Sequence, residues 1–338
     1  MEEQISLKDP YLMAEDLLLK EDFGKSDSER WAAVITALGR SMPEIEHPIM
    51  GLAVLARYYL EEKKEGEKGR RLLQKAIQRD RFNKGDERQS EAMAAACMAL
   101  IRYYESRPSL TDRQRDELAE AYEQAIPFLR SEKYEDALAM ICYNLGRSYH
   151  LTGKTEQALN AYKLAAVSFR RKLVGILPPQ VVRECKECLA DACFWIGYDS
   201  RQGRPAEAVK SFEESITIYT LLSVTENTRN YDALLVRSIE ELLALLLDQG
   251  EAQESEGLCL KLISLTEELE KSQPGAWNTK LRNAYIRMGN IKGKTEGGKA
   301  PLPWYEKGLA CLNEIKAKKP EEEKCSRDLQ AAIEKLRQ

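Results

Sequence analysis

The sequence has no long hydrophobic run and no strong excess of either charge. Its longest apolar stretch, residues 242–247, is far shorter than the ~20 residues that span a bilayer. Lys and Arg number 51 against 55 Asp and Glu, a balance that does not favour nucleic acid or an anionic membrane as a partner. The first residues are acidic and lack the basic and apolar segments of a secretory signal. These absences predict a cytoplasmic chain that contacts neither membrane nor nucleic acid.

Residues that carry catalytic or metal chemistry are scarce as well. The chain has two histidines, His47 and His150, and no glycine loop that ends in Lys-Ser/Thr as a phosphate-binding loop does. Cys185, Cys188 and Cys193 are close in sequence, but they lie in a helical pattern without a second CxxC. We interpret them as core thiols of a reducing compartment. The sequence therefore predicts no enzyme, no cofactor and no metal site.

What the sequence does contain is a repeated helical hairpin. The clearest copy covers residues 143–169, where small residues and aromatics alternate at helical spacing on both sides of the Gly153 turn. A small or apolar anchor residue at the helix–helix contact recurs at intervals of 44–51 residues, at Ala56, Leu100, Gly146, Gly197, Leu243 and Gly289. One such hairpin cannot bury its apolar face alone, so we expect neighbours of the same kind stacked against it.

These residues resemble the tetratricopeptide repeat (TPR) family, in a form with long helices and degenerate copies. The resemblance implies an all-α fold, a right-handed α-α superhelix of helical hairpins. The family unit has ~34 residues, so each copy here is longer. In the second copy we expect the additional residues between the helices, at 105–117. The predicted organisation is N-terminal capping helices over 1–44, six hairpins over 45–315 and a C-terminal capping helix over 316–338.

The resemblance also predicts a binding surface, because first helices line the concave face in proteins of this family. Positions counted from the anchors place arginines, aromatics and polar residues on that face: Tyr143, Arg147, His150, Phe194, Tyr198, Arg201, Arg237 and Asn290. Guanidinium planes beside aromatic faces suit an extended peptide with acidic groups or a free carboxylate. The alternative interpretation is a solvated helix face with ordinary packing within the solenoid. Trp195, next to Phe194, is expected in the core.

Three functions follow from this organisation, in order of preference. The first is a non-enzymatic TPR scaffold that binds a peptide or protein partner in its concave groove. The second is a peptide-sensing regulatory protein of the long-helix type, which changes conformation when its ligand binds. The third is an enzyme that uses the cysteine cluster. A nucleic-acid track is disfavoured because Asp191, Glu240 and Asp248 interrupt any positive stripe.

Overall fold

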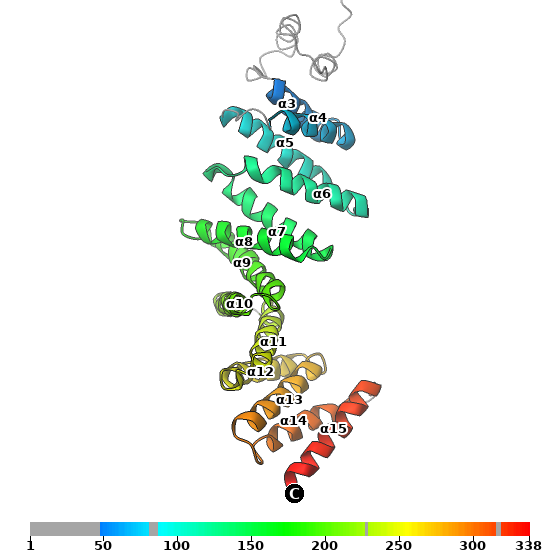
Figure 1. Ribbon diagram of the computed structural model, residues 1–338, viewed down its shortest axis with the longest axis vertical. Coiled ribbons are helices and arrows are strands. Elements are labelled where there is room, and N and C mark those ends of the chain that lie inside the picture. The colour runs from blue at the N-terminus through cyan, green and yellow to red at the C-terminus, as the bar shows by residue number, and fades with distance from the viewer. Residues whose placement is uncertain (1–47, 81–86, 227–228, 316–318) are drawn as a thin grey trace, which may run out of the picture. The chain divides into compact units, whose positions relative to one another are not determined.

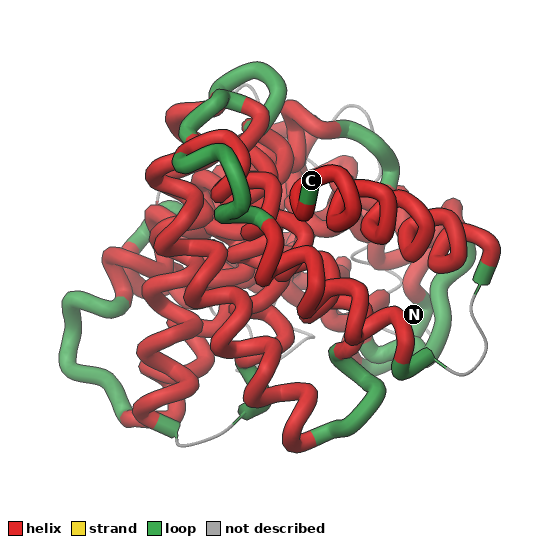
Figure 2. Tube along the Cα trace, turned by 90° about the horizontal axis from the view of Figure 1, so that it is seen from below, coloured by secondary structure: helices red, strands yellow, loops and turns green. Residues whose placement is uncertain are grey.

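The structure, a computed structural model, describes residues 48–80, 87–226, 229–315 and 319–338. All regular structure in these ranges is helical, and they contain no strand (Figure 2). Successive helices pair as hairpins joined by short connections, as Figure 1 shows in chain order. The predicted all-α fold of helical hairpins is therefore confirmed.

The described helices form six hairpins followed by one further helix. The hairpins are α3 (Pro48–Glu61) with α4 (Gly66–Asp80), α5 (Glu87–Glu105) with α6 (Asp112–Ala125), α7 (Glu135–Leu151) with α8 (Thr155–Lys172), α9 (Pro179–Ser200) with α10 (Pro205–Thr225), α11 (Asp232–Asp248) with α12 (Ala252–Ser272), and α13 (Asn278–Thr295) with α14 (Leu302–Asn313). The last helix is α15 (Pro320–Arg337), and two 3₁₀ turns, η2 (Ile126–Phe128) and η3 (Glu132–Tyr134), precede α7.

Contacts divide the chain into two compact units, residues 1–168 and 169–338, with the division inside α8. We call them unit 1 and unit 2 and describe each by itself. In unit 1, α3 packs on α4 and α5, and α6 packs on α5 and α7. In unit 2, each helix from α9 to α15 packs on the next. The predicted segment 1–44 lies outside the described residues, and the boundaries 45–315 and 316–338 and the handedness of the superhelix stay predictions.

The six anchor residues all lie on first helices and are all buried. Three of them are glycines, and an aromatic ring of the second helix occupies the space that a side chain would need. A Cβ built on Gly146 would lie 2.7 Å from Cδ1 of Tyr162, and one on Gly197 would lie 2.9 Å from the ring of Phe212. Gly289 faces the ring of Tyr305 in the same way. The close approach of ring to backbone fixes how each hairpin closes.

The second hairpin differs from the sequence-based expectation. We expected residues 105–117 to be an insertion between helices, but α6 already begins at Asp112. Thr111 caps it: its Oγ1 accepts from the Gln114 backbone N–H at 3.3 Å, and the Gln114 side chain accepts from the Thr111 N–H at 3.0 Å. This reciprocal capping box fixes the helix start. The additional residues instead lie after α6, where η2 and η3 lead to α7.

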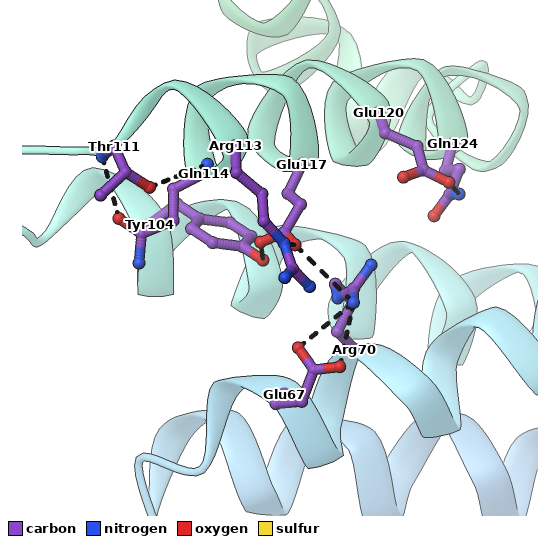
Figure 3. Close-up of polar contacts among 9 residues, drawn as sticks. All are labelled: Glu67, Arg70, Tyr104, Thr111, Arg113, Gln114, Glu117, Glu120 and Gln124. Atoms are coloured by element: carbon purple, nitrogen blue, oxygen red, sulfur yellow. Dashed lines mark hydrogen bonds and ion pairs between the residues drawn. The ribbon is translucent and has the colours of Figure 1, made fainter.

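A partly buried charge network ties the first two hairpins together (Figure 3). Arg70 of α4 reaches Glu117 of α6 at 3.7 Å and Glu67 of its own helix at 3.0 Å. Glu117 also accepts hydrogen bonds from Tyr104 of α5 at 2.8 Å and from Arg113 at 2.9 Å. Burial alone would raise the pKa of Glu117, but these hydrogen bonds and the Arg70 charge outweigh it and lower the pKa below its usual value.

The ring-on-glycine contact predicts opposite outcomes for two glycine substitutions. Gly146→Ala should lower the free energy of unfolding by about 1–3 kcal/mol, because the fully buried Tyr162 ring has no room to move aside. Gly257→Ala is the control, because Gly257 is exposed within α12 and its Cβ would meet nothing within 4 Å. It should raise stability by about 0.5–1 kcal/mol. Urea denaturation followed by circular dichroism measures both, and a neutral Gly146→Ala would contradict the packing described.

The Glu117 network predicts a pH-dependent contribution to stability. The folded-state pKa of Glu117 lies below its unfolded value, so its ionised form stabilises the fold above the unfolded pKa, and this is lost as pH falls through the folded pKa. Glu117→Gln should therefore lower the melting temperature at neutral pH. The difference from the parent chain should shrink as pH drops below about 4, the usual range for a glutamate. A difference that stays constant with pH would show that the charge of Glu117 contributes nothing.

Candidate functional site

The eight residues predicted to bind a partner fall in both units. Three of them, on α7, belong to unit 1: Tyr143, Arg147 and His150. The other five belong to unit 2: Phe194 and Tyr198 on α9, Arg201 directly after α9, Arg237 on α11 and Asn290 on α13. Each set is therefore described within its own unit.

Phe194 is a core residue, so its prediction as a partner contact was wrong. Only 3% of it is exposed, and its ring meets Phe212 of α10 edge-on at 5.7 Å. The physical reason is helical spacing: Phe194 lies three residues before the anchor Gly197 and so shares its inward face. Trp195, expected in the core, is half-buried instead, and its Nε1 donates to Asp191 at 3.1 Å.

The arginines of unit 2 are used to join neighbouring hairpins. The Arg237 guanidinium of α11 lies 3.6 Å from the Phe194 ring centroid and 4.6 Å from that of Trp195, both on α9. The guanidinium of Arg201, the residue that directly follows α9, lies 4.0 Å from the Tyr198 ring centroid and forms an ion pair with Glu241 of α11 at 3.1 Å. Cation–π contacts and ion pairs of this kind stabilise the stacking of hairpins.

Two further contacts continue the same pattern. Tyr231, the residue before α11, donates to Glu187 of α9, and Lys280 of α13 pairs with Glu240 of α11. Burial, followed by the bond to Glu187, raises the pKa of Tyr231 to about 12. The remaining predicted residue of unit 2, Asn290, is exposed and accepts from the Tyr305 hydroxyl at 2.8 Å. In this unit the predicted residues thus make internal contacts, as the packing interpretation expects.

In unit 1 the predicted residues lie beside a pocket. Tyr143 is half-buried and meets the Tyr162 ring at 6.2 Å, and His150 is half-buried near the end of α7. Arg147 is exposed, with its guanidinium 6.0 Å from the Tyr143 ring centroid. It lines a pocket of about 730 Å³ together with residues of α5, α6 and α7, which we call the α5–α7 pocket: Glu105, Asp112, Arg115, Asp116, Leu118, Tyr122, Asn144, Arg147, Ser148, Leu151 and Thr152.

The hydrogen bonds of the pocket centre on Glu105. The buried Tyr122 donates its hydroxyl to Oε1 of Glu105 at 2.7 Å, and Asn144 donates to the same oxygen at 3.5 Å. Burial and then the bond to Glu105 raise the pKa of Tyr122, so it remains a donor at neutral pH. The Glu105 carboxylate is thereby held by Tyr122 of α6 and by Asn144 of α7.

The charged groups of the pocket differ in how far they are neutralised. Arg115 pairs with Asp112 at 2.8 Å, and both side chains are well exposed. Among the residues that the structure describes, Glu105, Asp116 and Arg147 form no ion pair. Leu151, with 81% of its surface exposed, adds a large apolar side chain to the lining. The pocket therefore combines apolar surface with charges of both signs that lack internal counter-charges.

Sequence reasoning found one wall of this pocket and missed the other. Counting from the Gly146 anchor selected Arg147 but not Asn144. Glu105, Asp116 and Tyr122 were missed because they come from the preceding hairpin. The signal that would have led to Glu105 is the hydroxyl of Tyr122 on the second helix. A buried hydroxyl needs a hydrogen-bond acceptor, and Glu105 at the end of the first helix supplies it.

The cysteine cluster shows no reactive thiol. Cys185 and Cys193 are buried and Cys188 is half-buried. Burial is the main cause that raises the pKa of Cys188, to about 11, which disfavours the nucleophilic and metal-binding thiolate. Within the described residues, no group of three or more His, Cys, Asp and Glu side chains is arranged to hold a metal ion.

In the ranges that the structure covers, no helix is both long enough and apolar enough to cross a bilayer.

Comparisons with known proteins find similarity in fold alone. No protein-family model matches the chain, and no curated protein matches it significantly. Among solved structures, the chain is similar to Nro1, a hypoxic regulator of sterol synthesis and nuclear import adaptor, with a TM-score of 0.49 and 12% identity over 94% of this chain and 97% of that one. It is similar to the TPR-like repeats of a kinesin light chain from Podosopora anserina, with a TM-score of 0.35 and 18% identity over 68% of this chain and 100% of that one. It is also similar to the TPR2AB domain of yeast Sti1 in complex with pHSP90, with a TM-score of 0.34 and 16% identity over 97% of each chain.

The contacts of Arg237 predict a structural effect of its substitution. Arg237→Ala should lower the free energy of unfolding by about 1–2 kcal/mol, because it removes the cation that covers Phe194 and Trp195. Arg327→Ala is a matched control on the exposed face of α15 and should change stability by less than about 0.5 kcal/mol. Chemical denaturation of the two variants measures the difference. Equal, small effects would show that Arg237 does not join the hairpins.

Proposed function

We propose that this chain is a non-enzymatic scaffold that binds a peptide or a peptide segment of a protein through the α5–α7 pocket. The observation that carries the proposal is the pocket itself, which joins three helices of two successive hairpins. It is lined by Glu105, Asp116 and Arg147, which form no ion pair with any residue that the structure describes. Its volume of about 730 Å³ lies within the range of sites that enclose small ligands or a few residues of a peptide.

The lining chemistry supports recognition of a peptide. Leu118, Leu151 and Tyr122 offer apolar and aromatic surface, while the Asn144 amide can pair with a peptide backbone. The exposed Arg147 guanidinium can receive an acidic side chain or a terminal carboxylate of the partner. An acidic group in the partner is thus part of the proposal at this position.

The absence of catalytic partners in the lining supports a binding role. Among the residues that the structure describes, the hydroxyl groups that line the pocket are those of Ser148, Thr152 and Tyr122, and no histidine, lysine or cysteine of these ranges lines it. Activation of a serine or threonine nucleophile needs an adjacent base and a group that orients it. A pocket of this composition is better suited to hold a ligand than to transform it.

One observation favours the regulatory alternative as a second candidate. The chain divides into two compact units, with the division inside α8. A peptide that binds one unit can then change the conformation of the whole chain, as a peptide-sensing regulator requires. Small-angle scattering with and without a bound peptide distinguishes the two: a scaffold keeps its radius of gyration, whereas a sensor changes it.

The binding proposal predicts that peptides selected on the full chain will depend on the pocket. We expect a random-peptide phage library to yield binders whose affinity falls roughly tenfold, about 1.4 kcal/mol, in Arg147→Ala and also falls in Leu151→Ser. The control Arg327→Ala should leave their affinity unchanged, and melting temperatures should show that all variants fold. Selected peptides that bind all variants equally, or a library that yields no binder, would contradict the proposal.

A further inference from the structure

The carboxylates of the α5–α7 pocket point to the chemistry of its ligand. Glu105 at the end of α5 and Asp112 and Asp116 on α6 supply three carboxylates to the lining, against the two guanidinium groups of Arg115 and Arg147. Since Arg115 is already paired with Asp112, the groups without an internal ion pair among the described residues are two carboxylates and one guanidinium. The uncompensated charge on the α5–α6 side of the pocket is therefore negative.

The hydrogen bonds of Glu105 leave one of its oxygens available. Both internal donors, the Tyr122 hydroxyl and the Asn144 amide, bind Oε1. They are neutral groups, so they orient the carboxylate without cancelling its charge. Within the described residues no donor is bound to Oε2, which can accept from an incoming N–H group. A carboxylate held in this way is prepared to bind a cation.

The arrangement suits an organic cation better than a metal ion. No three of the acidic, cysteine and histidine side chains in the described ranges converge closely enough to form a metal site. Glu105 and Asp116 instead line a pocket that also holds the apolar side chains of Leu118 and Leu151. Arginine and lysine side chains have this dual character, with an apolar stem and a charged end. Phosphate groups, as in nucleic acid or lipid, would be repelled by the same carboxylates.

We propose that the α5–α7 pocket selects a peptide segment with a basic residue, arginine or lysine, whose charged end is bound by Glu105 and Asp116. The stem of that residue lies along Leu118 and Leu151, and Arg147 on the opposite helix receives an acidic or carboxylate group elsewhere in the same segment. This inference rests on the proposed peptide-binding function and adds the sign of the charge that the pocket selects. It predicts a partner segment of mixed charge.

The test uses peptides selected on the full chain from a random-peptide phage library and then made synthetically. We expect the selected sequences to be enriched in arginine or lysine. Replacement of the selected arginine by citrulline, its neutral isostere, should weaken binding roughly tenfold, as should the double variant Glu105→Gln with Asp116→Asn. Added salt should weaken binding of the arginine peptide more than that of its citrulline counterpart.

Matched controls separate charge from folding. Glu105→Gln keeps an oxygen that accepts from Tyr122, so the helices should pack as before, and Asp116→Asn alone changes a residue outside that hydrogen bond. The double variant Asp328→Asn with Glu334→Gln removes the same charge from the exposed face of α15 and should leave affinity unchanged.

The outcomes distinguish this inference from the function on which it rests. Peptides that lose affinity in Arg147→Ala but contain no basic residue, or that bind equally with citrulline, would overturn the basic-residue inference and leave the binding function intact. If no selected peptide depends on any residue of the pocket, both proposals fail. Loss of affinity with citrulline and in the Glu105 and Asp116 variants, but not in the α15 control, is the result that supports the inference.

Discussion

Three of the six hairpins depend on the contact between a glycine on the first helix and a large aromatic ring on the second. The ring lies against the backbone itself, as Tyr162 does at Gly146 and Phe212 at Gly197. This contact sets the distance between the two helices and hence the surface that the hairpin offers to the next one. At Gly146 this contact helps to position α7, which carries Asn144 and Arg147 of the α5–α7 pocket.

The two units use their charged side chains differently. In unit 2, Arg201 and Arg237 lie on aromatic rings or carboxylates of neighbouring first helices and contribute to the stacking of hairpins. In unit 1, the Arg70–Glu117 network has the same role between α4 and α6. Arg147, Glu105 and Asp116 differ from these groups, because they form no ion pair among the described residues. That difference is the physical reason for placing a binding site in unit 1.

Much of the fold could be predicted from the sequence, because a helical hairpin is specified by local spacing. The anchors, the Gly153 turn and the second-helix rings all lie within a few turns of one another along the chain. The start of α6 was missed although its signal, Thr111 followed by Gln114, is equally local. Phe194 was expected on the groove face and Trp195 in the core, whereas Phe194 is the buried residue of the two. Neighbouring positions on a helix point about 100° apart, so an error of one residue moves a side chain from the groove to the core.

The site could be predicted only in part, because its walls come from different hairpins. Arg147 followed from its own anchor, whereas the contact between Glu105 and Asn144 depends on how two hairpins of unequal length stack. The extra residues after α6 shift that stacking by an amount that no spacing rule gives. Which charges are neutralised internally, and which remain for a ligand, depends on the same stacking.

Hydrogen–deuterium exchange of the full chain with and without a selected peptide shows directly whether the peptide binds in the α5–α7 pocket. We expect slower exchange confined to the end of α5, the first three turns of α6 and the second half of α7, the segments that form this pocket. Protection located on the first helices of unit 2 instead, with no change in these three segments, would contradict it.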